Sequence, residues 1–425
     1  MLPRLLSSSF CLLISLQVLL LQGSDTNSSK KPAAPASPSP HLPPSLGDPS
    51  WALGLRLYKA IRSDSSLVNT IFSPLLLASS FGALGEGSVG KTATQIQNLL
   101  TYPSPSKKAV EGVGELLSGS LKSFTEANGT SFQLHTSSAL FTKQAPAVSQ
   151  TFKKKSQTKF GVLHQTLGKG DSKADLKQLR DWAKDGLRGL EGARLEAEIK
   201  AKAGALILGN VLRFKGLWER QFSEETIDRR IFLGTKYTKV VMMHRAGLYR
   251  FYEDTDNMVQ VLEAPLWGGK ASFVLLLPFH VESLARLDKL LTLELLSKWL
   301  EKTSVTSVAI SIPKANISST FSLQKQLSSL GLTDAWDQKV ADFSGVSEKG
   351  KGKLHLAGVL HWASLELAAQ AGKEEAKLEE ENIAGPKLFY ADHPFIICVR
   401  DNTTGALLLI GALEHVEGEA FHDEL

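Results

Sequence analysis

A charged run that leads directly into an apolar strand near the C-terminus constrains the fold of this chain most strongly. Residues 372–400 read GKEEAKLEEENIAGPKLFYADHPFIICVR. The first half has no apolar period, whereas Phe395–Val399 has the composition of a buried strand. Loops of more than about 12–15 residues inside a compact domain are usually functional or disordered. We therefore expect a long charged loop beside a core strand.

The chain divides into a processed leader, a tail, one large domain and a short end. A basic start, an apolar run and small residues predict a signal peptide over 1–23. A Pro-, Ser- and Ala-rich stretch predicts a flexible tail over 24–50. Because no linker or repeat follows, 51–417 is expected to be one α+β domain. Residues 418–425 form a C-terminal tail ending in His422, Asp423, Glu424 and Leu425, a retention signal of the endoplasmic reticulum.

Periodicity predicts the main elements. Apolar side chains at helical spacing begin at Trp51, where Asp48 is a candidate N-cap and Pro49 the first helical residue. Leucines on one face predict a single helix over 283–300. Strands are expected over 132–142, 205–214 and 354–367, the last long and apolar enough to be central in a sheet.

Five ordered segments carry a family resemblance: NTIFSP at 69–74, NVLRFKGLW at 210–218, ADFSG at 341–345, YADHPFI at 390–396 and TGALLLIG at 404–411. Together they resemble the serpins over roughly 51–413. The resemblance implies a serpin fold of three β-sheets surrounded by about nine helices. It also implies an exposed reactive-centre-like loop and a monomer.

Within the serpins, VMMHRAGLY at 241–249, KLFYADHPF at 387–395 and the terminal HDEL are similar to the collagen-binding, serpin H type of the endoplasmic reticulum. That similarity implies a non-inhibitory chaperone of the lumen. Its expected partners are the collagen or procollagen triple helix and the receptor that reads the retention signal. A lumenal serine-protease inhibitor with an atypical loop, or a non-inhibitory serpin with another client, are the alternatives.

The charged loop argues against protease inhibition. Inhibitory serpins insert the cleaved loop into a sheet, where alternate side chains are buried. The expected reactive-loop region contains Gly372, Lys373, Glu374 and Glu375 and a would-be scissile bond near Asn382–Ile383. One register buries Lys373, Glu375, Lys377, Glu379 and Glu381, and the other buries Glu374, Ala376, Leu378, Glu380 and Asn382. An unpaired buried charge costs several kcal/mol, so we expect insertion to fail.

The collagen-binding residues follow from the resemblance and from strand geometry. A collagen rod has no pockets and presents repeating side chains, of which arginine is the most directional. In an extended segment Leu388, Tyr390 and Asp392 share one face. The resemblance implies that Asp392 pairs with a collagen arginine and that Leu388 and Tyr390 make apolar contacts. Arg230 and Leu233 match further collagen-facing positions.

Four histidines are candidates for a structural or a pH-sensing role. The resemblance places His361 beneath the central sheet, bonded to Asn210. His244, His280 and His393 are candidate pH sensors, since histidine titrates between neutral and mildly acidic pH. Residues 223–224 (SE) and 279–280 (FH) stand where serpin H has histidine pairs. The sequence therefore gives less support to a pH switch based on those histidine pairs.

Other functions lack support in the sequence. Gly85–Thr92 fits the pattern G-x-x-x-x-G-K-T, but a buried helix precedes it, so a helix–helix turn is favoured over a nucleotide site. A net charge of +5 permits an acidic partner, but the basic clusters lack interleaved aromatics, so nucleic acid is not expected. No catalytic motif, metal spacing or cofactor site is found, and we expect neither an enzyme nor membrane insertion.

Two chemical features remain. Of the two cysteines, Cys11 lies in the leader, so Cys398 is expected to be a lone, inert core thiol. Sequons for N-glycosylation occur at Asn27, Asn128, Asn316 and Asn402.

Overall fold

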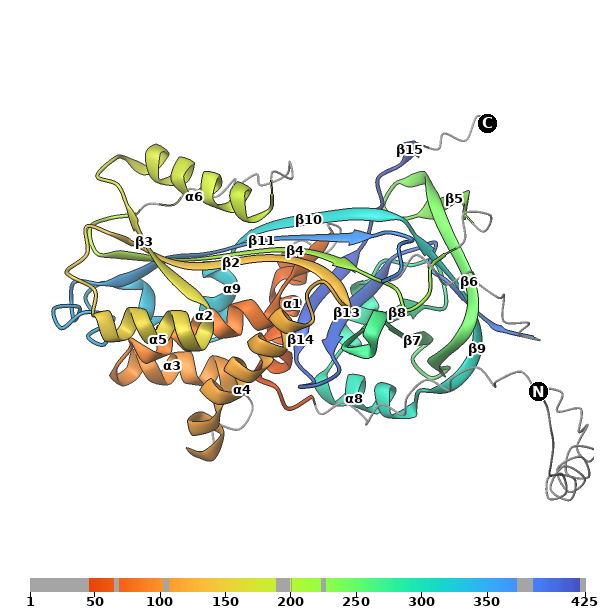
Figure 1. Cartoon of the computed structure of the whole chain (residues 1–425), viewed down its shortest axis with the longest axis horizontal. Helices are drawn as coiled ribbons and strands as arrows, with labels where there is room; N and C mark the ends of the chain where they lie inside the picture. The colour runs from red at the N-terminus through yellow and green to blue at the C-terminus, as the bar shows by residue number, and fades with distance from the viewer. Residues whose placement is uncertain are drawn as a thin grey trace, which may run out of the picture. The chain divides into compact units, whose positions relative to one another are not determined.

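A computed structural model describes residues 46–64, 69–101, 107–188, 199, 201–222, 227–372 and 385–420. These residues form nine α-helices and fifteen β-strands in two sheets (Figure 1). The helices are α1 (Pro49–Asp64), α2 (Pro74–Glu86), α3 (Gly90–Thr101), α4 (Lys107–Glu126), α5 (Gln150–Phe160), α6 (Ser172–Gly186), α7 (Ala285–Leu290), α8 (Leu293–Lys302) and α9 (Gln324–Ser329).

The strands are β1 (Thr70–Phe72), β2 (Phe132–Lys143), β3 (Val162–Leu167), β4 (Ala205–Gly216), β5 (Ile227–Leu233), β6 (Tyr237–Asp254), β7 (Val259–Pro265), β8 (Ala271–Pro278), β9 (Ser304–Pro313), β10 (Ala315–Ser322), β11 (His355–Leu367), β12 (Lys387–Tyr390), β13 (Phe395–Asp401), β14 (Leu407–Leu413) and β15 (Glu419–Ala420).

The five-stranded sheet has the order β10-β11-β4-β2-β3 and is covered on both faces. In Figure 1, α6 lies over one face and helices α2 and α5 lie on the other side. Ile207 and Val211 of β4 belong to the apolar cluster that includes Leu179 of α6, whereas Leu208 and Leu212 belong to the main core. A strand buried on both faces needs a continuous apolar run, and this pattern over 354–367 led to the expectation that β11 is a central strand.

The second sheet has ten strands and includes the candidate site. Its main order is β1-β14-β13-β8-β7-β6-β9-β12, with β5 and β15 also paired to β6. Two continuous sheets therefore stand in place of the three expected. The reason is the length of β6, whose 18 residues pair with β5 and β9 along most of the strand and with β7 near its end. One long strand joins what would otherwise be two sheets.

The ends of the described chain are tied to the core. Asp48 accepts a hydrogen bond from the Ser50 N–H (2.8 Å) and another from the Ser120 hydroxyl (2.6 Å), so the expected cap of α1 is present. Leu46 and Ser50 are buried as well, so the described residues before 51 pack with the domain. At the other end, β15 pairs with β6, so Glu419 and Ala420 of the expected tail join the larger sheet.

The single helix expected over 283–300 is two helices. α7 ends at Leu290 and α8 starts at Leu293. Thr292 lies between them in an extended conformation, and its hydroxyl accepts a hydrogen bond from the Leu295 N–H (3.1 Å). A threonine N-cap starts a new helix although the leucine period continues through it.

Candidate collagen-binding site

β12 presents the segment that the sequence singles out. It is an edge strand parallel to β9, with Leu388 opposite Ala309 and Tyr390 opposite Ser311. The Leu388 side chain is 68% exposed, whereas Phe389 is fully buried. Tyr390 and Asp392 are half-buried, and Ala391 between them is buried. The expected alternation is present, because burial of Phe389 and Ala391 in the core turns the other three side chains outward.

Neighbouring strands hold β12 in place. Lys387 forms an ion pair with Glu253 at the end of β6 (Nζ–Oε2, 2.8 Å), and this hydrogen bond is the main cause that lowers the pKa of Glu253. Gln260 of β7 donates to the Leu388 carbonyl (2.9 Å) and to Glu253 (3.2 Å). The Ala391 N–H donates to the Ser311 carbonyl (2.9 Å). The outward residues are therefore displayed on a strand fixed at both ends.

Asp392 is connected to two other elements. Its backbone carbonyl accepts a hydrogen bond from the Leu233 N–H at the end of β5 (2.6 Å). Its carboxylate Oδ1 lies 2.8 Å from Nδ1 of His393, and the other ring nitrogen of His393 lies 2.9 Å from the Pro278 carbonyl. Both ring nitrogens face acceptors, so both contacts are hydrogen bonds only when His393 carries two protons. The Asp392 side chain is 24% exposed, and Oδ2 has no partner among the described residues.

A chain of contacts joins Arg230 to Tyr390. Arg230 on β5 donates to Oδ2 of Asp228 through Nε (2.8 Å) and Nη2 (2.6 Å). Oδ1 of Asp228 lies 2.8 Å from Nε2 of His244, and that hydrogen bond is the main cause that lowers the pKa of Asp228. The His244 ring stacks on Tyr390 with 6.2 Å between centroids, and its Nδ1 lies 2.7 Å from the Ser311 hydroxyl.

The structure therefore brings the sequence-predicted residues together. Arg230 connects to Tyr390 through Asp228 and His244, and Leu233 bonds to Asp392 directly. Sequence reasoning missed Asp228, although it lies two residues before Arg230 on the same strand face. It also missed the Glu253 and Gln260 supports, which come from β6 and β7 and leave no signal near 388–392.

A groove of about 470 Å³ adjoins the displayed face. The third candidate sensor, His280, is exposed and lines this groove together with His393. The full lining is Glu253, Gln260, Leu277, Pro278, Phe279, His280, Val281, Leu388, Tyr390, Asp392 and His393.

The stem of the expected reactive loop leaves the five-stranded sheet at Ala368. Its carbonyl accepts a hydrogen bond from the Trp218 indole (2.6 Å), and the Gly372 N–H donates to the Trp218 carbonyl (3.3 Å). A Cβ at Gly372 would lie 2.0 Å from Cγ of Trp267, so only glycine fits there. Lys373, Glu374, Glu375, Asn382 and Ile383 lie outside the described residues.

The five-stranded sheet is closed beside that stem. β11 pairs with β10 on one side and with β4 on the other, and Glu366 of β11 forms an ion pair with Lys215 of β4 (2.9 Å). A segment that folds back along β11 as a new strand must first break one of these two pairings. Insertion therefore has to separate paired strands as well as bury the loop's charges.

The expected hydrogen bond between His361 and Asn210 is not formed. The two residues are opposite each other in β11 and β4, but Nε2 of His361 accepts from the Ser73 N–H (3.0 Å). The Asn210 amide oxygen accepts from the Ser80 and Ser138 hydroxyls (2.7 Å each). The two serine hydroxyls therefore occupy the acceptor on Asn210 that was expected to bind His361. Burial lowers the pKa of His361 to about 3, so the ring is neutral.

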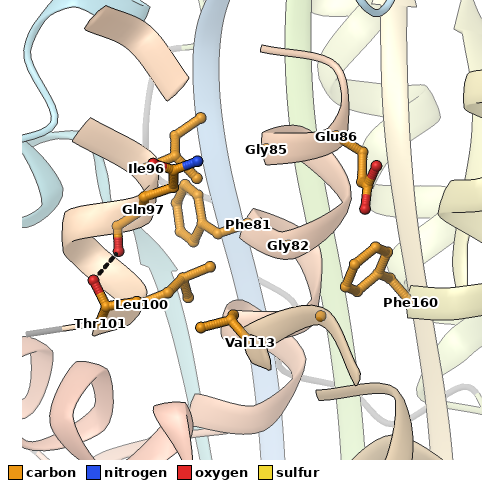
Figure 2. Close-up of a pocket in the computed structure, with 11 residues that line it drawn as sticks. Phe81, Gly82, Gly85, Glu86, Ile96, Gln97, Leu100, Thr101, Val113 and Phe160 are labelled. Atoms are coloured by element: carbon orange, nitrogen blue, oxygen red, sulfur yellow. Dashed lines mark hydrogen bonds between the residues drawn. The ribbon is translucent and has the colours of Figure 1, made fainter. Parts of the chain in front are cut away.

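The glycine-rich turn at 85–92 ends α2 and starts α3, as the helix–helix interpretation predicts. Gly85 and Glu86 line a pocket of about 300 Å³ between helices α2, α3, α4 and α5 (Figure 2). Glu86 lies 3.4 Å from the ammonium of Lys155 and 4.0 Å from that of Lys159. Glycines, apolar side chains and polar side chains all line the pocket, and the one carboxylate among them, Glu86, is already paired with lysines.

The described residues give little support for a metal site, a reactive thiol or a membrane-spanning helix. In the described part of the chain, no group of three or more His, Cys, Asp or Glu side chains could hold a metal ion. Cys398 is free and buried, and burial raises the pKa of its thiol to about 12, so it stays protonated. Among the described residues, no helix is long and apolar enough to cross a membrane.

This fold and the 390–396 segment define the class. The family description "Serpin (serine protease inhibitor)" matches residues 50–416, and the chain belongs to the serpin family. It is similar to uncleaved ovalbumin (TM-score 0.76, 21% identity, 87% of this chain and 100% of that one). It is also similar to a tumour suppressing serpin (TM-score 0.74, 24% identity, 87% of this chain and 99% of that one). The expected α+β serpin fold is confirmed.

Within the family the chain is a relative of the serpin H type. It is 36% identical to Serpin H1 of Mus musculus over 89% of this chain and 90% of that protein. Its identity to Serpin H1 of Pongo abelii is also 36%, over 99% of each chain. Antithrombin-III of Homo sapiens is 26% identical over 81% of this chain and 75% of that protein.

Proposed function

We propose that the chain is a non-inhibitory serpin that binds collagen or procollagen triple helices as a chaperone of the endoplasmic reticulum lumen. The observation that carries the proposal is the outward row of Leu388, Tyr390 and Asp392, with Arg230 and Leu233 held beside it. The similarity to Serpin H1 supports the same reading.

The row matches what a triple helix offers. The open oxygen of Asp392 can accept a charge-assisted hydrogen bond from an arginine side chain, and a second parallel bond would have to share Oδ1 with His393. Exposed Leu388 and half-buried Tyr390 can pack on the imino-acid surface of the rod. No step of this binding requires catalysis or a cofactor, so the chain acts as a binder and not as an enzyme.

The lumenal location rests on the leader over 1–23 and on the terminal His422–Leu425 signal, both outside the described residues.

We also propose which sequons carry glycans in that compartment. Asn316 on β10 is exposed. Asn128 after α4 is also exposed, but it donates its side-chain amide to the Leu134 carbonyl (3.1 Å). The Asn402 amide donates to the Gly269 carbonyl (3.0 Å) and to the Ser272 hydroxyl (2.9 Å), so a glycan there would cost a hydrogen bond. Asn27 lies outside the described residues.

The test is binding of the purified protein to a triple-helical peptide with one arginine at a Y position, at neutral pH. Removing one partner of a hydrogen-bonded charge pair at an interface costs about 2 kcal/mol or more, so Asp392→Ala should weaken binding by roughly thirtyfold or more. Glu348→Ala, an exposed carboxylate on another surface, should bind normally. Failure of the wild type to bind would leave a serpin with a different client.

A protease inhibitor is the second candidate, because the family description and the similarity to antithrombin-III point to that activity. An inhibitor of this family would form an SDS-stable complex with a target protease. The charged segment 373–382 argues against it, since each inserted register buries charges.

A further inference from the structure

A lysine-rich turn lies just before β11. Residues 347–353 read SEKGKGK, and the three lysine side chains are exposed. The backbone of the turn requires its glycines, because a Cβ at Gly350 would clash with the Phe343 carbonyl oxygen and Gly352 has a φ of +69°. No such requirement applies to the exposed lysines beside them. The fold therefore explains the glycines of this turn and does not explain its lysines.

Two other segments bring further lysines to the turn. The side-chain amide of Gln338 donates to the carbonyls of Ala203 (3.3 Å) and Lys353 (2.9 Å). Lys202 precedes Ala203 and Lys339 follows Gln338 in the chain, and both lysines are exposed. One amide group therefore holds three lysine-bearing segments together.

Most of these lysines have no counter-ion. Among the described residues, no ion pair is formed by four of them: Lys202, Lys339, Lys349 and Lys353. The fifth, Lys351, pairs with Asp342 (3.4 Å). The other carboxylates next to the lysines are Asp337 and Glu348, which are exposed. Positive charge therefore exceeds negative charge on this part of the molecule.

Two exposed valines lie beside the lysines. Val340 is 52% exposed and Val89 is 45% exposed. The Val89 N–H donates to the carbonyl of Asp342 (3.0 Å), the residue that pairs with Lys351. An exposed apolar side chain gains free energy when a partner covers it. We call the following residues the lysine surface: Lys202, Lys339, Lys349, Lys351, Lys353, Val89 and Val340.

The combination of ammonium groups and exposed valines favours an acidic peptide over other anionic chains. Lysines on a surface attract any polyanion and speed its association. The valines distinguish between polyanions, because a sulfated polysaccharide has no apolar side chains to cover them. A peptide that carries leucine or valine among its carboxylates matches both features of the surface.

The lysine surface is separate from the proposed collagen face. The turn at 347–353 leads into β11, which starts in the left part of Figure 1, whereas β9 lies on the right. β12, which presents the outward row, pairs with β9 in the other sheet. One molecule can therefore hold a client and an acidic partner at the same time.

We propose that the lysine surface docks an extended acidic segment of another protein, with apolar side chains between the carboxylates. This inference goes beyond the proposed function and does not depend on collagen binding. Because the charges lie at the surface, binding weakens as the salt concentration rises.

The experiment uses the full chain and a fluorescein-labelled peptide in which leucines are spaced among glutamates. Fluorescence anisotropy at neutral pH and low salt should show saturable binding. The double variant Lys349→Glu, Lys353→Glu replaces two attractions by repulsions and should weaken binding roughly tenfold. The matched control is Lys289→Glu, Lys298→Glu, which changes the net charge equally. It uses exposed lysines of α7 and α8 that form no ion pair with a described residue, and it should bind like the wild type.

A second peptide, with serine in place of each leucine, tests the valines. It keeps the charge and loses the apolar side chains, so it should bind the wild type more weakly. Val340→Ser should weaken binding of the leucine peptide about threefold and leave the serine peptide unchanged. Unchanged unfolding temperatures would show that the variants are folded.

Three results would overturn the proposal. The first is no binding of the leucine peptide by the wild type, and the second is an equal loss in the two lysine double variants. The third is tighter binding of heparin than of the peptide together with no effect of Val340→Ser, which would assign the surface to a polysaccharide. The triple-helical arginine peptide should bind every variant like the wild type, so its failure to bind would concern the collagen function alone.

Discussion

Nδ1 of His393 lies 2.8 Å from Oδ1 of Asp392, the carboxylate proposed to take the client's arginine. The other ring nitrogen faces the Pro278 carbonyl at 2.9 Å. A second proton on His393 therefore satisfies both contacts and places a positive charge against Asp392. The other charged or titratable groups near this pair include Glu253, His280 and Tyr390 of the groove lining, and Lys387, which is paired with Glu253.

This relationship predicts that His393 limits the affinity for the client. Its ring occupies Oδ1 of Asp392, so the client's arginine has to share this carboxylate with the histidine. His393→Leu keeps the side-chain volume but removes the contact, and it should strengthen binding of the arginine peptide several-fold. Affinity measured by titration calorimetry or surface plasmon resonance at neutral pH checks the prediction.

His135→Leu is the control, since His135 is on β2, in the other sheet. It should bind the peptide like the wild type. Weaker binding by His393→Leu would show that His393 positions Asp392 and does not compete with the arginine.

The geometry around Asp392 could be predicted only in part. Alternation along 388–392 was predictable because it depends on strand period and on the apolar Phe389 and Ala391 alone. The contact chain through Asp228 and His244 was not, because it depends on the pairing of β5 with β6 and of β6 with β9. These pairings bring together residues far apart in the sequence, and no local pattern specifies their register.

The same distinction applies to the fold. Asp48 and Pro49 predicted the start of α1, because capping is a local effect. The prediction of one helix over 283–300 missed the break at Thr292. It used only the spacing of the leucines and did not consider that a threonine can cap a new helix. The predicted hydrogen bond between His361 and Asn210 was wrong, because hydroxyl groups from α2 and β2 donate to the Asn210 amide oxygen.

Adjacent arginines on β5 provide a sharp test of the site. Arg229 and Arg230 are 64% and 56% exposed, but strand alternation turns them to opposite faces. Arg229 pairs with Glu419 (3.6 Å), whereas Arg230 joins the network that reaches Tyr390. Arg230→Ala should weaken peptide binding about tenfold, and Arg229→Ala should leave it unchanged. Equal effects of the two substitutions would indicate a general electrostatic attraction in place of a specific contact.

His361 predicts a pH dependence of stability. Burial lowers its pKa from 6.5 to about 3 in the folded protein, so below pH 6.5 the unfolded chain binds a proton that the folded chain does not. The free energy of unfolding should therefore decrease as the pH falls from 6.5, by about 1.4 kcal/mol per pH unit, until the folded state also titrates near pH 3.

Chemical denaturation at pH 7 and pH 5 measures this contribution. The wild type should lose about 2 kcal/mol more than His361→Gln between the two values. His280→Gln is the control, since His280 is exposed and should leave the wild-type dependence unchanged. If His361→Gln loses as much stability as the wild type, other groups carry the acid sensitivity.

The unfolding temperature after cleavage of the loop distinguishes a chaperone from an inhibitor. Insertion must break the pairing of β11 with β4 or β10 and bury charges from 373–382, so a nick in this segment should leave the unfolding temperature unchanged. The double variant Glu374→Thr, Glu380→Thr leaves one register free of charge. Because each buried charge costs several kcal/mol, its cleaved form should melt roughly 10 °C higher than its intact form. A similar rise in the cleaved wild type would show that the charged loop inserts and would restore the inhibitor hypothesis.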